Sequence, residues 1–218
     1  MHASNDQSGV ARRRFLKGTL ATAAGGLLVP AVASRSQAAA ALPVVGQTVN
    51  LSVSVFGAVM TSSLQSGEQT LNFIGSRVVK VLAGGPDFVR LQSLDFTLEA
   101  AHPLFGKITM TLPDVDLSPL STVRLSSSGF TETWYETSKI KFERSGNLPG
   151  PFEFQSEKPL TATATMPNWP PPPQATNPDG SPTGGVLYSV VQPPTFTGGD
   201  QRVDFTAFPP NVGQLLAP

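Results

Sequence analysis

The sequence predicts an all-β fold over residues 41–218: a single β-sandwich domain, with a β-barrel as the alternative. Three observations support this prediction. The 218 residues include 21 Pro and 20 Gly, which interrupt helices and mark the turns between short strands. Several segments alternate apolar and polar residues with a period of two, as half-buried strands do. After residue 41, no segment of helical length repeats its apolar residues every 3.6 positions, as an amphipathic helix would.

Four strands are expected in the N-terminal part of this domain, over residues 47–55, 70–82, 88–98 and 108–112. Gly75 interrupts the second pattern, so we expect a bulge or a break there. In the third, the apolar alternation changes phase by one residue, which predicts a bulge near Ser93. The last two strands are joined through His102-Pro103 and are predicted to form a hairpin.

The C-terminal part is expected to hold a short strand around Val123 and further strands over 130–142, 160–166, 186–191 and 202–208. Residues 167–182 contain seven prolines and are predicted to form a loop with a short polyproline piece. This gives roughly eight to nine strands with turn signals about every 8 to 15 residues, typical of a sandwich or a barrel. The proline-rich connections and unequal strands favour the open sheets of a sandwich.

The composition of the domain excludes several kinds of partner and site. Residues 41–218 carry 10 Lys and Arg against 14 Asp and Glu, and this mildly acidic balance does not suit nucleic acid or anionic lipid. The sequence contains no cysteine, which excludes disulfides, thiolate nucleophiles and thiolate metal sites. The domain must therefore be held by its core alone, which about 178 residues can supply.

Residues 1–40 differ from the rest, because they hold five basic residues against Asp6 alone. The run Ala11-Arg12-Arg13-Arg14-Phe15-Leu16-Lys17 resembles the bacterial twin-arginine signal motif, Ser/Thr-Arg-Arg-x-Phe-Leu-Lys. The residues that match this motif are Arg12, Arg13, Phe15, Leu16 and Lys17, whereas Ala11 stands where Ser or Thr is usual. The resemblance covers only this segment, and it implies that the twin-arginine translocase exports the folded protein.

The rest of the segment is typical of a cleavable signal peptide. Residues 18–33 are uncharged and rich in Ala and Gly, and Ala38 and Ala40 form an Ala-x-Ala cleavage site. A basic nucleic-acid arm would not be followed by such a stretch, and a spanning helix needs about 20 apolar residues. We therefore expect a signal helix over residues 1–40 and a mature domain with no stable membrane span. That domain would reside in the periplasm, in the cell envelope or outside the cell.

His102 is the one histidine after residue 40, so any histidine-based acid–base mechanism in the domain must use it. Its place before Pro103 favours a turn residue instead. The sequence also lacks the Gly-x-Ser-x-Gly elbow that seats a serine nucleophile in one large hydrolase class. A metal site with several histidines is excluded within one chain.

Two aspartates are candidate calcium ligands. Asp114 and Asp116 lie two residues apart, so on an extended strand their side chains would share a face at a spacing of about 6.7 Å. Together with loop carbonyl oxygens they could bind calcium, which takes oxygen ligands. The neighbouring prolines favour turn chemistry instead, and Asp179 has the same two interpretations. No other cofactor is expected.

Glu132 and Glu136 flank Trp134 and share its parity in the strand pattern. Four residues along a strand span about 13 Å, whereas the two carboxyls of a glycosidase lie about 5 to 9.5 Å apart. The pair could therefore act together only if the strand bends between them. A hydrolase could also draw its carboxylates from separate strands.

Aromatic residues offer a different kind of site. Trp134, Tyr135, Trp169 and Tyr188 could form a platform for a sugar ring, although parity places Trp134 in the core. Trp169 lies in the proline-rich loop over 167–182, where it could contact a ligand or pin the loop onto the sheet. We favour pinning, because large exposed apolar groups are the exception in a monomer.

Two function hypotheses follow. The leading one is a non-enzymatic exported protein that binds a ligand or belongs to the cell envelope. The alternative is an extracellular carbohydrate-active hydrolase with carboxylates from separate strands. An enzyme should show converging carboxylates in a concave site. A self-assembling surface protein should show exposed strand edges or a large apolar patch. The sequence identifies neither a ligand nor a protein partner.

Overall fold

The structure, a computed structural model, describes residues 41–113 and 119–215. These residues form strands joined by turns and loops and contain no helix, which confirms the all-β prediction. The described residues accordingly include no helix long and apolar enough to cross a membrane. The predicted signal peptide, residues 1–40, lies outside the described part of the chain.

The described residues form the following strands, given in chain order. The first eight strands are β1 (Thr48–Ser62), β2 (Gln65–Leu82), β3 (Phe88–His102), β4 (Gly106–Thr111), β5 (Ser121–Ser126), β6 (Gly129–Glu136), β7 (Lys139–Ser145) and β8 (Leu148–Lys158). The remaining strands are β9 (Leu160–Met166), β10 (Gln174–Thr176), β11 (Pro182–Gly184), β12 (Val186–Leu187), β13 (Ser189–Gln192), β14 (Thr195–Gly198), β15 (Gln201–Ala207) and β16 (Pro210–Gln214).

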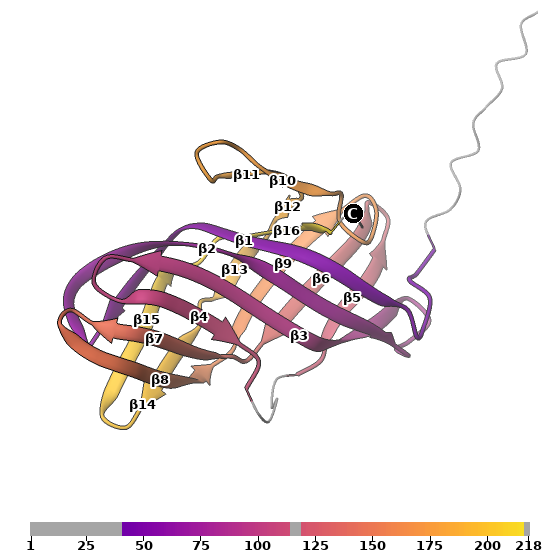
Figure 1. Cartoon of the computed structure of the whole chain (residues 1–218). Coiled ribbons are helices and arrows are strands. Elements are labelled where there is room, and N and C mark those ends of the chain that lie inside the picture. The colour runs from indigo at the N-terminus through magenta and orange to yellow at the C-terminus, as the bar shows by residue number, and fades with distance from the viewer. Residues whose placement is uncertain (1–40, 114–118, 216–218) are drawn as a thin grey trace, which may run out of the picture. The chain divides into compact units, whose positions relative to one another are not determined.

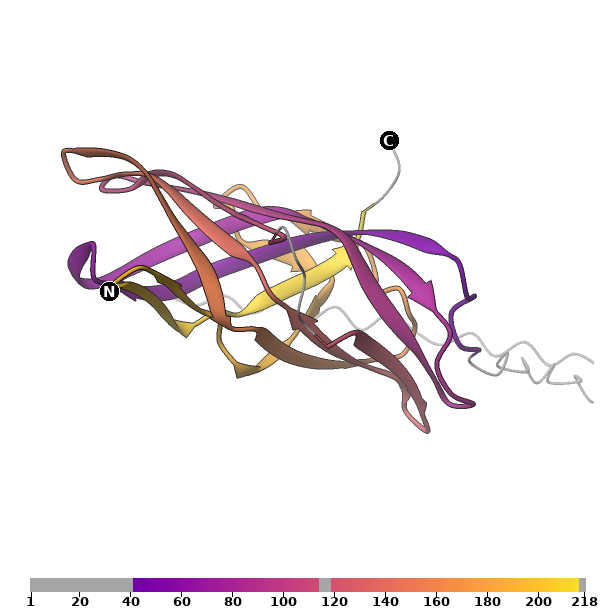
Figure 2. The same cartoon turned by 90° about the horizontal axis from the view of Figure 1, so that it is seen from below.

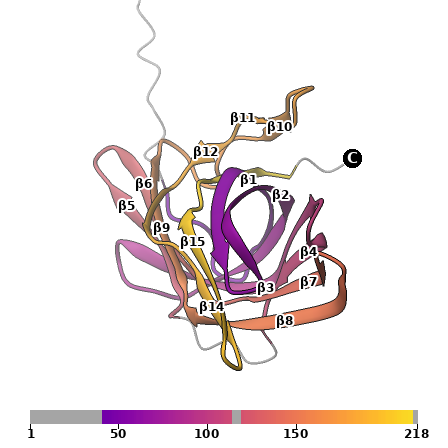
Figure 3. The ribbon, with the colours of Figure 1, turned by 90° about the vertical axis from the view of Figure 1, so that its left-hand side faces the viewer.

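The described strands close into a barrel, seen end-on in Figure 3. Neighbouring strands pair antiparallel in the order β1, β2, β3, β4, β7, β8, β14 and β15, and β15 returns to pair with β1, which closes the ring. Of the two predicted forms of the all-β fold, the strand pairing therefore follows the barrel. Along strands such as β4, β6 and β9, alternate side chains are buried, as expected where one face of a barrel strand lines the interior.

Three long strands, β1, β2 and β3, run the length of the barrel as the indigo to magenta ribbons of Figures 1 and 2. The remaining barrel strands are shorter, and each of them covers only one end of the long strands. The barrel therefore has two ends with different sets of strands. At one end, β4, β7, β8, β14 and β15 complete the ring of strands. At the other end, β5 pairs with β3, and β6, β9 and β13 follow it in that order. On the opposite side of this end, β16 pairs with β1 and with β12.

Phenylalanines fill the interior of the first of these ends, which we call the aromatic end. Its buried rings are Phe73, Phe105, Phe142, Phe154, Phe196, Phe205 and Phe208. Neighbouring rings in this set have centroids 5.0 to 6.1 Å apart and are tilted or edge-on. These are the spacings and tilts at which aromatic pairs add to the stabilisation from burial. The opposite end, which we call the polar end, has a different interior.

Two local predictions meet different outcomes. The bulge expected near Ser93 is confirmed, because Val78 pairs with Asp95 and Val79 with Ser93. Leu94 is thus the extra residue, and it points outward with 47% of its surface exposed.

The bulge or break expected at Gly75 is wrong. The pairing of β2 with β1 and β3 continues through this residue without a change of register. Glycine is needed there for space: a Cβ at Gly75 would lie 1.8 Å from the carbonyl oxygen of Thr97 on β3. The residue therefore allows two backbones to approach closely, which is another use of glycine within a strand.

Several strands were not expected from the sequence. β8 begins with Pro149, Gly150 and Pro151, a run that predicts a loop. The short strands β14 and β16 follow prolines as well. The predicted proline-rich loop over 167–182 also contains β10 and the start of β11, which pair as a small hairpin.

Candidate functional site

A charged side chain, Arg77, lies inside the polar end of the barrel. It belongs to β2, whose other inward residues are apolar, among them Phe73 and Val79. The alternation of the strand turns the side chain of Arg77 inward, where 1% of it is exposed. Since a guanidinium keeps its proton at any ordinary pH, it brings a permanent positive charge into the interior.

Two glutamates of β6 neutralise that charge. The strand turns Glu132 and Glu136 inward together with Phe130 and Trp134. The Nη1 atom of Arg77 donates to Oε1 of Glu132 at 2.9 Å, and its Nε donates to Oε2 of Glu136 at 3.1 Å. Both carboxylates are buried. Two acidic residues four positions apart therefore meet at a single guanidinium.

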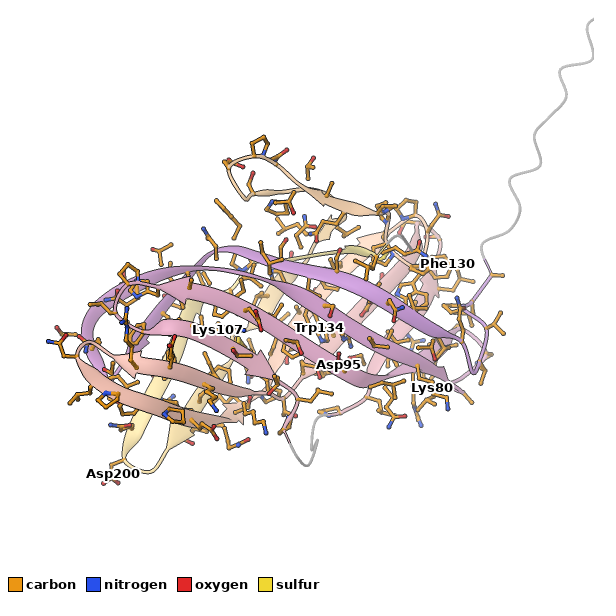
Figure 4. All side chains as sticks on the ribbon, viewed as in Figure 1. Lys80, Asp95, Lys107, Phe130, Trp134 and Asp200 are labelled. Atoms are coloured by element: carbon orange, nitrogen blue, oxygen red, sulfur yellow. The ribbon has the colours of Figure 1, made fainter. Side chains whose placement is uncertain are left out.

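Further side chains complete the polar contacts of this ion cluster. Ser93, beside the bulge, donates from Oγ to Oε2 of Glu136 at 2.7 Å. The Nη2 atom of Arg77 donates to Oγ of Ser121 at 2.9 Å. Trp134, labelled in Figure 4, donates from Nε1 to Oε2 of Glu136 at 2.9 Å. The Cζ atom of Arg77 lies 4.7 Å from the centroid of the Trp134 ring, a cation–π distance.

Glu132 accepts two more hydrogen bonds from outside the strands that hold the charges. Its Oε2 accepts from Nε1 of Trp169 at 2.8 Å and from the hydroxyl of Tyr188 at 2.9 Å. The Tyr188 ring stands edge-on to Trp134 with centroids 5.9 Å apart. Both donors are buried, and Trp169 is 9% exposed. We call the six residues Arg77, Glu132, Trp134, Glu136, Trp169 and Tyr188 the buried cluster.

Trp169 belongs to a connecting segment and not to a barrel strand. The segment, residues 167–176, follows β9 and ends with β10; we call it the strap. Its other contacts lie on the outer side of β16 and β1. The backbone N–H of Gln214 reaches the carbonyl oxygens of Pro171 and Pro172, each at 3.3 Å. Trp169 thus pins the inner part of the strap onto the barrel.

The side chain of Gln174 holds the outer part of the strap. Its Oε1 accepts from Oγ of Ser52 at 3.0 Å, and its Nε2 donates to Oγ of Ser54 at 2.9 Å. The same Nε2 donates to the carbonyl oxygen of Asn211 at 3.0 Å. A Cβ on Gly213 would lie 2.4 Å from Cβ of Gln174, so a glycine on β16 makes room for this contact. The strap therefore has one anchor inside the barrel and one outside.

The buried cluster is an expensive feature in energetic terms. Moving a charged group out of water costs several kcal/mol in proteins, and apolar residues of the same volume often stabilise a core as well or better. Burial, and then the nearby Glu132 carboxylate, raise the pKa of Tyr188 well above its usual value of 10. Tyr188 therefore remains a neutral donor at physiological pH. In this site, hydrogen-bond donors bind the carboxylate of Glu132, which is buried away from water.

The structure brings together only some of the residues singled out in the sequence. Trp134, Trp169 and Tyr188 meet, but they do so in the interior around the glutamates and not on an exposed platform. Tyr135 has the opposite parity and remains half-buried. The hydrolase hypothesis required carboxylates from separate strands. The two carboxylates of the buried cluster come from one strand and share one arginine.

His102 lies at the turn between β3 and β4, away from the buried cluster. Its Nδ1 accepts the backbone N–H of Leu104 at 3.3 Å, and its ring lies 5.3 Å from that of Phe105. Burial lowers its pKa from the usual 6.5. These contacts describe a histidine that caps a turn at the aromatic end.

The candidate calcium ligands give no assembled site in the described residues. Asp114 and Asp116 lie outside the described part of the chain. Asp179 is exposed, and its Oδ1 accepts from both the backbone N–H and the hydroxyl of Ser181, at 3.0 and 2.6 Å. These hydrogen bonds to Ser181 lower the pKa of Asp179. Across residues 41–113 and 119–215, no group of three or more acidic or histidine side chains could hold a metal ion.

A hollow of about 420 Å³ lies on the outer surface of the aromatic end. It is lined by Lys107, Thr109, Lys141, Glu143, Gly150 and Pro151, with Lys107 labelled in Figure 4. Lys107 pairs with Glu99 at 2.7 Å and Lys141 pairs with Glu153 at 3.0 Å. Both lysines are more than half exposed, and such pairs contribute little. The hollow offers neutralised charges and no buried polar group.

Arg77 is the central residue that the sequence interpretation missed. The signal was present: Arg77 occupies an inward position in a strand whose other inward residues are apolar. Glu132 and Glu136 occupy inward positions in another strand. Charged residues of opposite sign on the apolar faces of two strands predict an internal ion pair, because a charge buried without a partner is not tolerated.

Comparison with known proteins supports the fold. No protein-family model matches this sequence, and no curated protein sequence matches it. Among solved structures, the chain is similar to DynF from the dynemicin biosynthesis pathway of Micromonospora chersina, with a TM-score of 0.59. The match covers 81% of this chain and 84% of that chain at 14% sequence identity. The two proteins therefore share the fold over most of their lengths.

Proposed function

We propose that this chain is an exported, non-enzymatic binding protein that holds a small organic molecule at the buried cluster. The observation that carries the proposal is the acceptor Oε2 of Glu132, buried in the barrel and closed off by the strap. A core without a binding role would gain more from apolar residues at these positions, as at the aromatic end. The ligand would carry N–H or O–H groups, because the acceptor is a carboxylate.

Thermal unfolding of the purified chain tests this proposal. The probes are soluble glycans, polyols, and aromatic alcohols and amines, each at several concentrations. We expect one class to raise the midpoint as its concentration rises. A ligand that binds only the folded state stabilises it by about 2.7 kcal/mol at a hundredfold excess over Kd.

Two matched variants locate the site. Glu132→Gln keeps the shape of the side chain but removes its charge, whereas Phe142→Leu disturbs the aromatic end and leaves the buried cluster intact. The ligand-induced shift should be lost in Glu132→Gln and kept in Phe142→Leu. A shift that survives in Glu132→Gln would contradict the proposed site, and the absence of any shift across the panel would contradict the proposed function.

Export through the twin-arginine translocase forms the second part of the proposal. It is supported by the resemblance of Arg12, Arg13, Phe15, Leu16 and Lys17 to the signal motif. The residue at the variable position, Arg14, offers a matched control. We expect Arg12→Lys/Arg13→Lys to leave the precursor in the cytoplasm, whereas Arg14→Lys is exported normally. A mature N-terminus at residue 41, measured by mass spectrometry, would support cleavage after Ala40.

A further inference from the structure

Trp169 has an unusual place among the residues of the buried cluster. Arg77, Glu132, Trp134 and Glu136 belong to barrel strands, so none of them can leave without breaking strand pairing. Trp169 comes from the strap, and its indole N–H can be withdrawn from Glu132 while the barrel remains closed. The other donor to this oxygen, Tyr188, lies between β12 and β13, and its backbone N–H bonds to the carbonyl oxygen of Pro210 at 2.8 Å. Trp169 is therefore the donor that an incoming molecule can replace more readily.

The composition of the strap favours such a movement. Four consecutive prolines, residues 170–173, provide no backbone N–H groups to hold the segment in place. The bonds from the Gln214 N–H to the carbonyl oxygens of Pro171 and Pro172 are long, at 3.3 Å each, whereas the Gly185 N–H reaches the carbonyl oxygen of Pro173 at 3.0 Å. Pro171 is also buried. The indole of Trp169 therefore holds the start of the strap, and the contacts of Pro173 and Gln174 hold its far end.

From this arrangement we infer that Trp169 occupies the position of the ligand, and that the ligand is a planar aromatic molecule bearing an N–H or O–H donor. The ligand displaces the indole from Glu132, and the inner part of the strap swings outward from its anchor at Gln174. This inference rests on the proposed function and adds to it the ligand class and the competing side chain.

The chemistry of the position restricts the ligand to this class. An aromatic ring without a donor would leave the buried Oε2 of Glu132 with one hydrogen bond fewer, which is unfavourable for a charged acceptor. A donor without a flat ring would leave unfilled the space that an indole occupies. Opposite Glu132 and Trp134, β9 presents the small buried side chains of Ala164 and Ala162.

Trp134→Phe in the full chain leaves Trp169 as the one tryptophan, because the sequence contains two. The fluorescence of Trp169 then reports how accessible the strap is to solvent. The probe is 4-methylphenol, and two matched molecules test each requirement: 4-methylanisole has the ring without the donor, and cyclohexanol has the donor without the ring. The measurements are the thermal midpoint and the quenching of Trp169 by acrylamide.

We expect 4-methylphenol to raise the midpoint and to increase acrylamide quenching several-fold, whereas the two matched molecules do neither. Trp169→Gly, which removes the competing indole, should bind 4-methylphenol at least tenfold more tightly, since the closed strap lowers the apparent affinity. If Trp134→Phe does not fold, hydrogen exchange in the unmodified chain provides the same test. The backbone amide of Gln214 should then exchange faster in the presence of 4-methylphenol.

The outcomes separate the two proposals. Stabilisation by any probe of the wider panel while Trp169 stays protected from acrylamide would overturn the displacement and leave the binding function intact. Equal effects of 4-methylphenol and 4-methylanisole would overturn the donor requirement. Stabilisation by no probe would overturn the displacement and the proposed function together.

Discussion

The two ends of the barrel interior use the same strand geometry for different contents. At the aromatic end, seven buried phenylalanines pack against one another. At the polar end, Arg77, Glu132 and Glu136 form an ion cluster within a shell of tryptophan, tyrosine and serine. Both ends are buried, yet among the described residues the buried charges, Arg77, Glu132 and Glu136, all lie at the polar end.

The two interiors differ in how well they tolerate substitution. Apolar burial is non-directional and tolerates exchange of one hydrophobic residue for another of similar volume. A buried ion cluster tolerates no such exchange, because each member satisfies a charge on another. We therefore expect single substitutions to be tolerated better among the apolar residues of the aromatic end than among the charged residues of the polar end.

The largest expected effect is the loss of Arg77. Arg77→Met leaves two carboxylates buried without their guanidinium, and breaking a buried pair in this way costs about 3 to 5 kcal/mol. Urea unfolding followed by circular dichroism would measure the loss of unfolding free energy.

A second variant sharpens this test. Arg77→Met combined with Glu132→Met and Glu136→Met removes all three charges and converts the polar end into an apolar core. It should recover stability relative to Arg77→Met alone, because no uncompensated charge remains. A triple variant less stable than the single one would show that the ion cluster itself stabilises the fold.

The positions of most strands were predictable from sequence at both ends. Alternating apolar residues identify β4, β7 and β15 at the aromatic end and β6 and β9 at the polar end, and the change of phase near Ser93 locates the bulge beside Arg77. β8 was missed because Pro149 and Pro151 mark loops in a local interpretation, although pairing with β7 keeps the segment extended.

The polar end required information that strand periodicity does not contain. The sequence could suggest that Trp169 pins its loop, but not that its partner is Glu132, 37 residues away on β6. Arg77 and Glu136 are 59 residues apart and meet only because the barrel closes. Pairing between distant strands decides such contacts, and one sequence without its relatives does not specify that pairing.

A smaller effect is expected at the boundary between the two ends. Gly75 separates Phe73, which faces the aromatic end, from Arg77, which faces the polar end. Gly75→Ala would place a Cβ against the Thr97 carbonyl oxygen, so β2 and β3 must separate, at a cost of about 1 to 3 kcal/mol. Urea unfolding would measure this loss, and an unchanged unfolding free energy in Gly75→Ala would contradict a steric role for Gly75.

The polar end should also make the protein sensitive to alkali. The pKa of Tyr188 is raised in the folded state, so the unfolded chain ionises first as the pH rises through about 10. The stability contributed by the neutral tyrosine is fully present below pH 10 and is lost above it, at about 1.4 kcal/mol per pH unit. Unfolding free energies between pH 9 and 11 would measure this slope. The slope should be shallower in Tyr188→Phe, and identical slopes would contradict burial of the hydroxyl.

The aromatic end should show the weakest pH dependence, and in the opposite direction. Burial lowers the pKa of His102, so the unfolded chain takes up a proton first as the pH falls through 6.5. Protonation also removes the Nδ1 acceptor of the Leu104 N–H. The contribution of neutral His102 is therefore present above pH 6.5 and declines below it, by less than the Tyr188 effect because the ring is partly solvated. The difference in unfolding free energy between the wild type and His102→Gln, measured from pH 7.5 to 5, should narrow as the pH falls. A difference that stays constant over this range would show that the titration of His102 is not coupled to folding.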